Sequence, residues 1–167
     1  MKYLILDNED IKRFSVLSGS LDDDRLTAYV EQAQDIHLQS YLGTKLYDAI
    51  QSHAIADTMP TDYTLLIDTY IKPMLMRWVL VEFIPFAPYN VANKGVFKGT
   101  SENAEVVSKE EVDAMVDKYT QTAMHYTKRL INYLCDKSEL YPEYNTNIGS
   151  DMTPQRTATG YGGLFLH

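Results

Sequence analysis

The side chains able to carry acid–base or metal chemistry are scattered along this chain. Its four histidines are His37, His53, His125 and His167, and none lies within four residues of another. Zinc-protease helices, phosphate-binding loops and serine nucleophile elbows each need a fixed spacing of histidine, glycine or serine that is absent here. We expect His37 and His125 to lie on helix surfaces or at the edge of a core. The chain predicts no catalytic, cofactor-binding or metal-binding site, and we expect it not to be an enzyme.

Three consecutive aspartates, Asp22 to Asp24, raise the alternative of a cation site. A calcium loop needs acidic residues at alternate positions, a central glycine and a final glutamate, and this segment lacks that pattern. Aspartates are favourable in the first turn of a helix, where they face the positive end of its dipole. We therefore interpret the run as the start of a helix.

Two charged residues, Arg77 and Glu82, interrupt the most apolar stretch of the chain. They lie five residues apart, so they do not face each other on a helix. A buried charge needs a partner, and both a subunit boundary and an ordinary pair within the chain would provide one. The single cysteine, Cys135, excludes an intramolecular disulfide, and we interpret it as a small apolar residue in a reducing compartment.

The elements that would position these residues are helices. Asp7 or Asn8 can cap a short helix that ends at Phe14. Apolar residues at spacings of three and four predict a second helix over residues 22–42, which Gly43 ends. We expect Thr44 to cap a short continuation; the stripe itself consists of Leu26, Tyr29, Val30, Ala33, Ile36, His37 and Tyr41.

The segment from Thr61 to Ala87 predicts the central helix of the domain. Thr61 can cap it, and Pro73 must bend it, because proline removes an amide donor and crowds the preceding turn. Beyond Trp78 the segment is apolar nearly all round, which is typical of a helix buried on every side. We expect Trp78 to be buried.

The last long helix begins at Ser108, which stands three residues before Glu111 and can form a capping box with it. Its apolar stripe runs to Leu134, and Pro142 closes the segment. Residues 90–100 hold two glycines and predict a loop or a short hairpin tip. The chain thus predicts an all-α fold: a small helical bundle over residues 1–144 with a long last helix, and an extended carboxyl-terminal arm over residues 145–167.

Size and charge agree with one ordinary globular domain. The chain has 167 residues, 45% of them hydrophobic, and a formal net charge of −8. That charge argues against a protein held on nucleic acid by a basic surface. No signal-peptide core is visible, and no stretch reaches the roughly 20 apolar residues that cross a bilayer. We expect a soluble protein made in the cytoplasm, with no membrane partner.

Thirteen tyrosines are a high count for this length, and tyrosine is enriched at protein interfaces. Five lie on the apolar stripes and are expected in the core: Tyr29, Tyr63, Tyr70, Tyr119 and Tyr126. Four others are expected in loops or the arm, where use at an interface stays open: Tyr89, Tyr141, Tyr144 and Tyr161.

The carboxyl-terminal arm ends in an apolar tip behind a glycine-rich tether. Such a tip is costly to leave in water, so we expect it to dock onto a partner rather than to fray. The predicted partner-binding residues are Tyr161, Leu164, Phe165 and Leu166.

The first fifty residues resemble the amino-terminal half of the head–tail connector (adaptor) proteins of tailed bacteriophages. The likeness rests on three pieces of text: Leu21-Asp-Asp-Asp-Arg-Leu26, Tyr29-Val-Glu-Gln-Ala33, and Tyr41-Leu-Gly43 followed by Leu46. The NKGV loop and the YPEY ending look most like connectors of phages that infect Bacteroidetes, including crAss-like phages. About 45 residues are covered closely, and the rest matches only in architecture.

The resemblance implies a virion protein at the head–tail junction. About twelve copies would form a homo-oligomeric ring that binds the portal protein and neighbouring tail or ring proteins. DNA would pass through the channel without specific binding, because an acidic wall gives no counterion-release attraction. The alternative that the residues leave open is a cytoplasmic helical adaptor or regulatory module that binds one protein partner.

Overall fold

The computed structural model describes residues 2–15, 23–87, 89–92, 95–98, 108–146 and 151–158. The fold is all-α, as predicted, with one small hairpin. The elements in chain order are α1 (Asn8–Phe14), α2 (Asp23–Ala33), a π-helical turn (Gln34–Leu38), α3 (Gln39–Leu42), α4 (Thr44–Ile55), α5 (Thr61–Leu66), a second π-helical turn (Ile67–Ile71), α6 (Lys72–Phe83), a 3₁₀ turn (Ile84–Phe86), β1 (Tyr89–Ala92), β2 (Gly95–Lys98), α7 (Lys109–Asp136), a 3₁₀ turn (Ser138–Leu140) and α8 (Pro142–Asn145).

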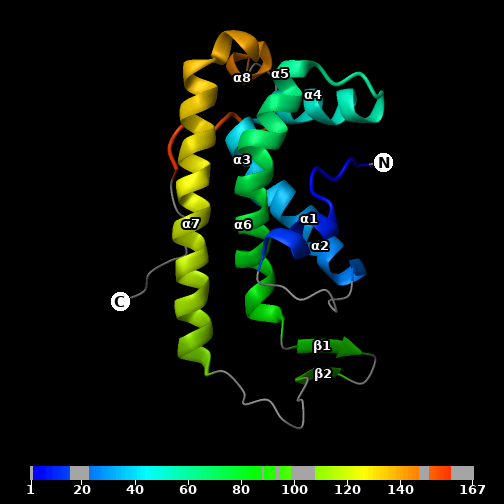
Figure 1. Ribbon diagram of the computed structural model, residues 1–167, viewed down its shortest axis with the longest axis vertical. Helices are drawn as coiled ribbons and strands as arrows, with labels where there is room; N and C mark the ends of the chain where they lie inside the picture. The colour runs from blue at the N-terminus through cyan, green and yellow to red at the C-terminus, as the bar shows by residue number, and fades with distance from the viewer. Residues whose placement is uncertain are drawn as a thin grey trace.

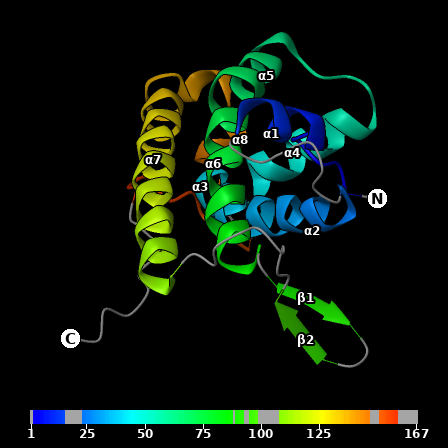
Figure 2. The ribbon, with the colours of Figure 1, turned by 60° about the horizontal axis from the view of Figure 1, so that its bottom comes forward.

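Helix α6 is the centre of the bundle. It lies between α7, which runs antiparallel to it along its length, and α2, which packs against its other side (Figures 1 and 2). Burial confirms the expectation for this segment, since Trp78 is 1% exposed and Met74, Leu75 and Val79 are fully buried. The core is therefore built around the most apolar stretch of the sequence.

The N-cap residues of α4 and α5 differ from those that the sequence predicts. Pro60 and Gly43 occupy the N-cap positions of α5 and α4, so Thr61 and Thr44 are the first helical residues rather than caps. Pro73 is the second residue of α6, directly after the π-helical turn. The wider π turn changes the hydrogen-bond ladder just where proline lacks its amide donor.

Helix α7 begins as the sequence predicts. The Ser108 hydroxyl accepts a hydrogen bond from the Glu111 amide, and the Glu111 carboxylate accepts one from the Ser108 amide, which completes the capping box. The helix ends at Asp136, so Pro142 does not close it but opens α8. The buried residues of α7 all lie from Ala123 onward.

The segment after α6 is a hairpin, one of the two forms expected there. Strands β1 and β2 pair antiparallel, with Tyr89 opposite Lys98 and Ala92 opposite Gly95. Within the described part of the chain, no helix has the length and apolarity needed to cross a membrane.

Candidate functional site

Part of the predicted arm lies against the chain's own body. The Thr44 amide donates to the carbonyl of Met152 over 3.0 Å, and the Met152 amide donates to the Thr44 hydroxyl over 2.9 Å. Farther along, the Gln155 amide donates to the carbonyl of Ser40 over 2.9 Å. Residues 151–158 are thus hydrogen-bonded to the corner between α3 and α4; we call them the anchored segment.

Gly43 makes this close approach possible. Its φ of 74° lies in the left-handed region, which L side chains rarely adopt. A Cβ at this position would lie 2.6 Å from Cδ of Pro154, closer than atoms can pack. The glycine that ends the predicted second helix is therefore also the seat of the anchored segment.

The far end of the anchored segment is held by α8 and the core. Arg156 donates to the side-chain oxygen of Asn145 over 3.1 Å, and its guanidinium lies 5.2 Å from the centre of the Tyr144 ring. Ala158 packs against the hydrophobic core. In both ribbon views this segment passes beside α7 (Figures 1 and 2).

The predicted partner-binding residues, Tyr161, Leu164, Phe165 and Leu166, lie outside the described residues. The structure nevertheless fixes where the chain leading to them leaves the body, because Ala158 is held. Leu164 lies six positions after Ala158, and a fully extended chain spans about 3.5 Å per residue. The Cα atom of Leu164 can therefore lie at most about 20 Å from that of Ala158.

A buried polar cluster surrounds Trp78. His37 is 3% exposed, so the expectation of a surface or core-edge histidine is wrong for this residue. Its Nε2 lies 2.7 Å from Oε1 of Glu82, and Oε2 of Glu82 accepts a hydrogen bond from Gln32. The His37 ring stacks on Trp78 at 3.8 Å, and the indole N–H of Trp78 donates to Thr127. The π-helical turn over residues 34–38 carries the histidine into this position.

Both charges of the apolar helix find partners within the chain. Glu82 pairs with His37, while Arg77 donates to the carbonyl of Pro73 and lies 4.4 Å from the centre of the Tyr126 ring. The intrachain alternative for these two charges is the one observed. His125 is exposed on α7, as predicted.

Tyr141 and Tyr144, whose role the sequence left open, are fully buried. Tyr141 donates to the carbonyl of Asp62 over 3.0 Å, and its ring meets that of Tyr63 edge-on at 5.4 Å. The Tyr63 hydroxyl in turn donates to Glu143 over 2.6 Å. These contacts join α5 to α8, so both tyrosines serve the core of the chain itself. The side chain of Tyr89 and all of Tyr161 lie outside the described residues.

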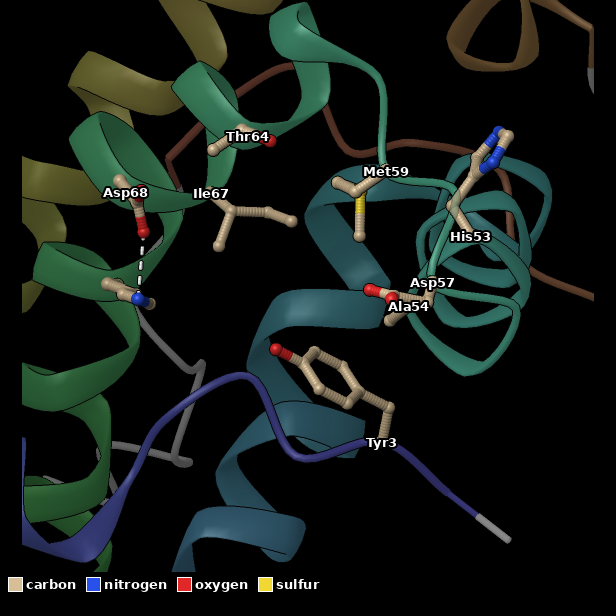
Figure 3. Close-up of a pocket in the computed structure, with 9 residues that line it drawn as sticks. Tyr3, His53, Ala54, Asp57, Met59, Thr64, Ile67 and Asp68 are labelled. Carbon is tan, nitrogen blue, oxygen red and sulfur yellow. Dashed lines mark ion pairs between the residues drawn. The ribbon is translucent and has the colours of Figure 1, made fainter.

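An open cavity of about 290 Å³ lies between the amino-terminal segment, the end of α4 and the column formed by α5 and α6 (Figure 3). It is lined by Tyr3, His53, Ala54, Asp57, Met59, Thr64, Ile67, Asp68 and Lys72. No local pattern of residues predicts this cavity, because its walls come from three separate stretches of the chain.

The described residues hold no group of three or more histidine, cysteine or acidic side chains placed to bind a metal ion. Asp23 and Asp24 lie in the first turn of α2, and Asp23 pairs with Lys12 over 2.6 Å. Cys135 is exposed rather than buried as an apolar residue would be, and its sulfur lies 3.9 Å from the Tyr144 hydroxyl.

Residues 38–153 match the model of a family of unknown function (DUF6712). That span covers more than half of the chain. The chain belongs to the DUF6712 family. No curated protein and no solved structure matches it.

The DUF6712 match begins inside the first π-helical turn and ends at Thr153. It therefore includes both sides of the contact between Thr44 and Met152, with Gly43 beside it. The amino-terminal text on which the connector resemblance rests lies mostly before the matched span. The contact between Thr44 and Met152 thus falls within the matched span, whereas the contacts of residues 154–158 lie beyond its end.

Proposed function

We propose that this DUF6712 protein is a non-enzymatic structural component of a bacteriophage virion, where it forms a ring that joins the portal to the tail. The observation that carries the proposal is the anchored segment. It holds Ala158, which the sequence places six positions before Leu164, against the helical body. A part that must link itself to neighbours in an assembly needs such an arrangement.

The sequence segment that resembles connector proteins is in contact with the anchored segment. Tyr41 and Leu42 are buried in the core, and Gly43 seats Pro154. The closest part of the resemblance covers residues 21–46, and the arm is indicated by the composition of residues 145–167. Their direct contact supports the interpretation of both as parts of one docking device.

Energetics favour assembly in many copies. Leu164, Phe165 and Leu166 could each bury a side chain worth about 1.5–3 kcal/mol on a partner. Ordering a tether that contains three glycines offsets part of this gain. Closed rings engage all copies at once, and linked binding events strengthen one another.

The net charge of −8 suits a channel through which DNA slides. Phosphates meet no excess of basic side chains, so the counterion release that drives non-specific DNA binding is missing. The same charge is compatible with the alternative function, a helical adaptor that binds a single protein partner.

Mass spectrometry of purified virions tests the proposal. The virions come from the phage whose genome encodes this chain, and the protein is quantified against the portal protein. We expect both in near-equal copy number, with portal and tail genes adjacent to that of the chain. A genome without a portal gene, or virions that lack the protein, would contradict the proposal and favour the adaptor.

A further inference from the structure

Asp57 adopts a left-handed backbone conformation, which is uncommon for residues other than glycine although aspartate tolerates it better than most. Its φ is 53°, and among the described residues it alone has a positive φ without being glycine. It follows the last turn of α4, where the Thr58 amide donates to the carbonyl of His53 over 3.0 Å. Glycine is the usual residue at this place, because a Cβ is strained there.

The Asp57 carboxylate points into the cavity described above (Figure 3). It forms no hydrogen bond or ion pair with any described residue. The chain thus keeps an uncompensated negative charge at a position where glycine would be easier to accommodate. An observed backbone outlier of this kind supports a hypothesis of function.

The opposite wall of the cavity is electrically balanced. Asp68 and Lys72 form an ion pair over 2.8 Å, which neutralises the one ammonium group of the lining. The imidazole of His53 points away from the cavity, and its Nδ1 lies 3.3 Å from the Thr58 hydroxyl (Figure 3). The cavity therefore carries a net negative charge that Asp57 provides, and it favours a cation.

The remaining lining is suited to an alkyl chain. The Tyr3 ring extends into the cavity, and Met59 and Ile67 contribute apolar surface (Figure 3). The backbone of Tyr3 is held at both of its polar atoms, since Gln51 accepts from its amide and donates to its carbonyl. The ring is therefore placed by the fold and can face a cation or an alkyl stem.

From these features we propose that the cavity binds an alkylammonium group, with the ammonium on the Asp57 carboxylate and the alkyl stem between Tyr3 and Ile67. A lysine side chain of another protein and a free aliphatic diamine both carry this group. The proposal does not depend on the ring function, because it concerns a site away from the anchored segment.

Nuclear magnetic resonance titration of the full chain tests the site. Amide shifts of residues 54–59 are followed as n-butylammonium chloride is added, with n-butanol as the uncharged counterpart. We expect saturable shifts with the amine and none with the alcohol. Absence of saturable shifts with the amine, or equal shifts with both compounds, would overturn the proposal.

The variant Asp57→Asn separates charge from backbone strain, because asparagine tolerates positive φ. It should keep the fold and weaken butylammonium binding at least tenfold. The matched control, Asp48→Asn, removes an exposed carboxylate from α4 outside the cavity and should leave the Kd unchanged. Equal binding by the wild type and Asp57→Asn would contradict the proposal.

Two further probes assign the source of the group. Nα-acetyl-lysine methylamide represents a protein side chain, and 1,4-diaminobutane represents a free diamine. Tighter binding of the first supports a partner protein, and tighter binding of the second supports a small diamine. Failure of both to compete with butylammonium would contradict the site.

Discussion

At the scale of single residues, the polar groups inside this core are mutually satisfied. No buried side-chain nitrogen or oxygen of the described residues lacks a hydrogen-bond partner. The cluster of His37, Glu82 and Trp78 is an example. The Glu82 carboxylate accepts a hydrogen bond from Gln32 and lies within hydrogen-bond distance of His37. The indole N–H of Trp78 donates to the Thr127 hydroxyl. A satisfied polar cluster specifies one packing of α2, α6 and α7.

Trp78 is the largest of the fully buried side chains in the described part of the chain, so its packing should contribute strongly to the free energy of unfolding. Replacing Trp78 with alanine should lower the free energy of unfolding by about 3–5 kcal/mol, because it empties a fully packed site. It also leaves the Thr127 hydroxyl without its donor. Urea unfolding followed by circular dichroism measures the change. A loss below about 1 kcal/mol would contradict the core assignment.

Gly43 can be tested through its contact with Pro154. Gly43→Ala should cost about 1–3 kcal/mol, because the extended conformation with positive φ is nearly confined to glycine, and it should also displace the anchored segment. Limited proteolysis should then cut residues 151–158 faster than in the wild type.

A second variant separates the two effects of the Gly43 substitution. Adding Pro154→Gly to Gly43→Ala removes the two ring atoms nearest to the Cβ and leaves the backbone nitrogen of residue 154 at 3.0 Å, so most of the steric part of the cost should disappear. Unchanged stability and unchanged protease resistance in Gly43→Ala alone would show that the segment is not seated there.

At the scale of elements, helix starts with polar caps were predictable and irregular turns were not. Asp7 and Ser108 cap α1 and α7 as expected, because capping is local chemistry between residues two or three apart. The two π-helical turns escaped prediction, since an extra residue in one turn barely changes the apolar periodicity. His37, which the apolar stripe of the second predicted helix includes, lies in one of these turns.

The tyrosine layer that joins α5, α7 and α8 predicts alkaline sensitivity. Burial raises the pKa of Tyr63, and its hydrogen bond to Glu143 adds to the effect. Burial also raises the pKa of Tyr141, and its hydrogen bond with Tyr133 raises that pKa further. A raised folded-state pKa means that the stability is fully present below the unfolded value of about 10 and is lost as pH rises through the folded values.

Urea unfolding between pH 8 and pH 11.5 measures this loss, and absorbance at 295 nm reports tyrosine ionisation. We expect the free energy of unfolding to fall steadily above a pH of about 10. The variant Tyr63→Phe removes one buried ionisable hydroxyl and should show a smaller fall over the same range. A free energy that stays constant up to pH 11.5 would contradict the account of the layer.

At the scale of the whole molecule, the sequence predicted the bundle and missed what distant segments build together. The apolar column around Trp78 follows from periodicity alone. Tyr3, Asp57 and Lys72 line one cavity although they are far apart in the sequence. Pro154 packs against Gly43, which precedes it by more than a hundred residues in the sequence. Contacts between such distant segments depend on the complete fold, so no local sequence pattern predicts them.

The division of the arm at Ala158 predicts two different truncation results. A chain ending at Ala158 keeps the anchored segment, and its melting temperature should stay near that of the full chain. A chain ending at Thr146 loses the contacts with Thr44, Gly43 and Ser40 and should melt several degrees lower. Calorimetry checks both, and equal melting temperatures for all three chains would show that the anchored segment adds no stability.

We propose that this protein joins a portal in many copies through its carboxyl-terminal tip. Light scattering of the portal protein mixed with the full chain, or with the chain ending at Ala158, tests it most directly. We predict that the full chain adds the mass of about twelve copies to the portal and that the truncated chain, although folded, adds none. No added mass with the full chain, or equal mass with both, would contradict the account.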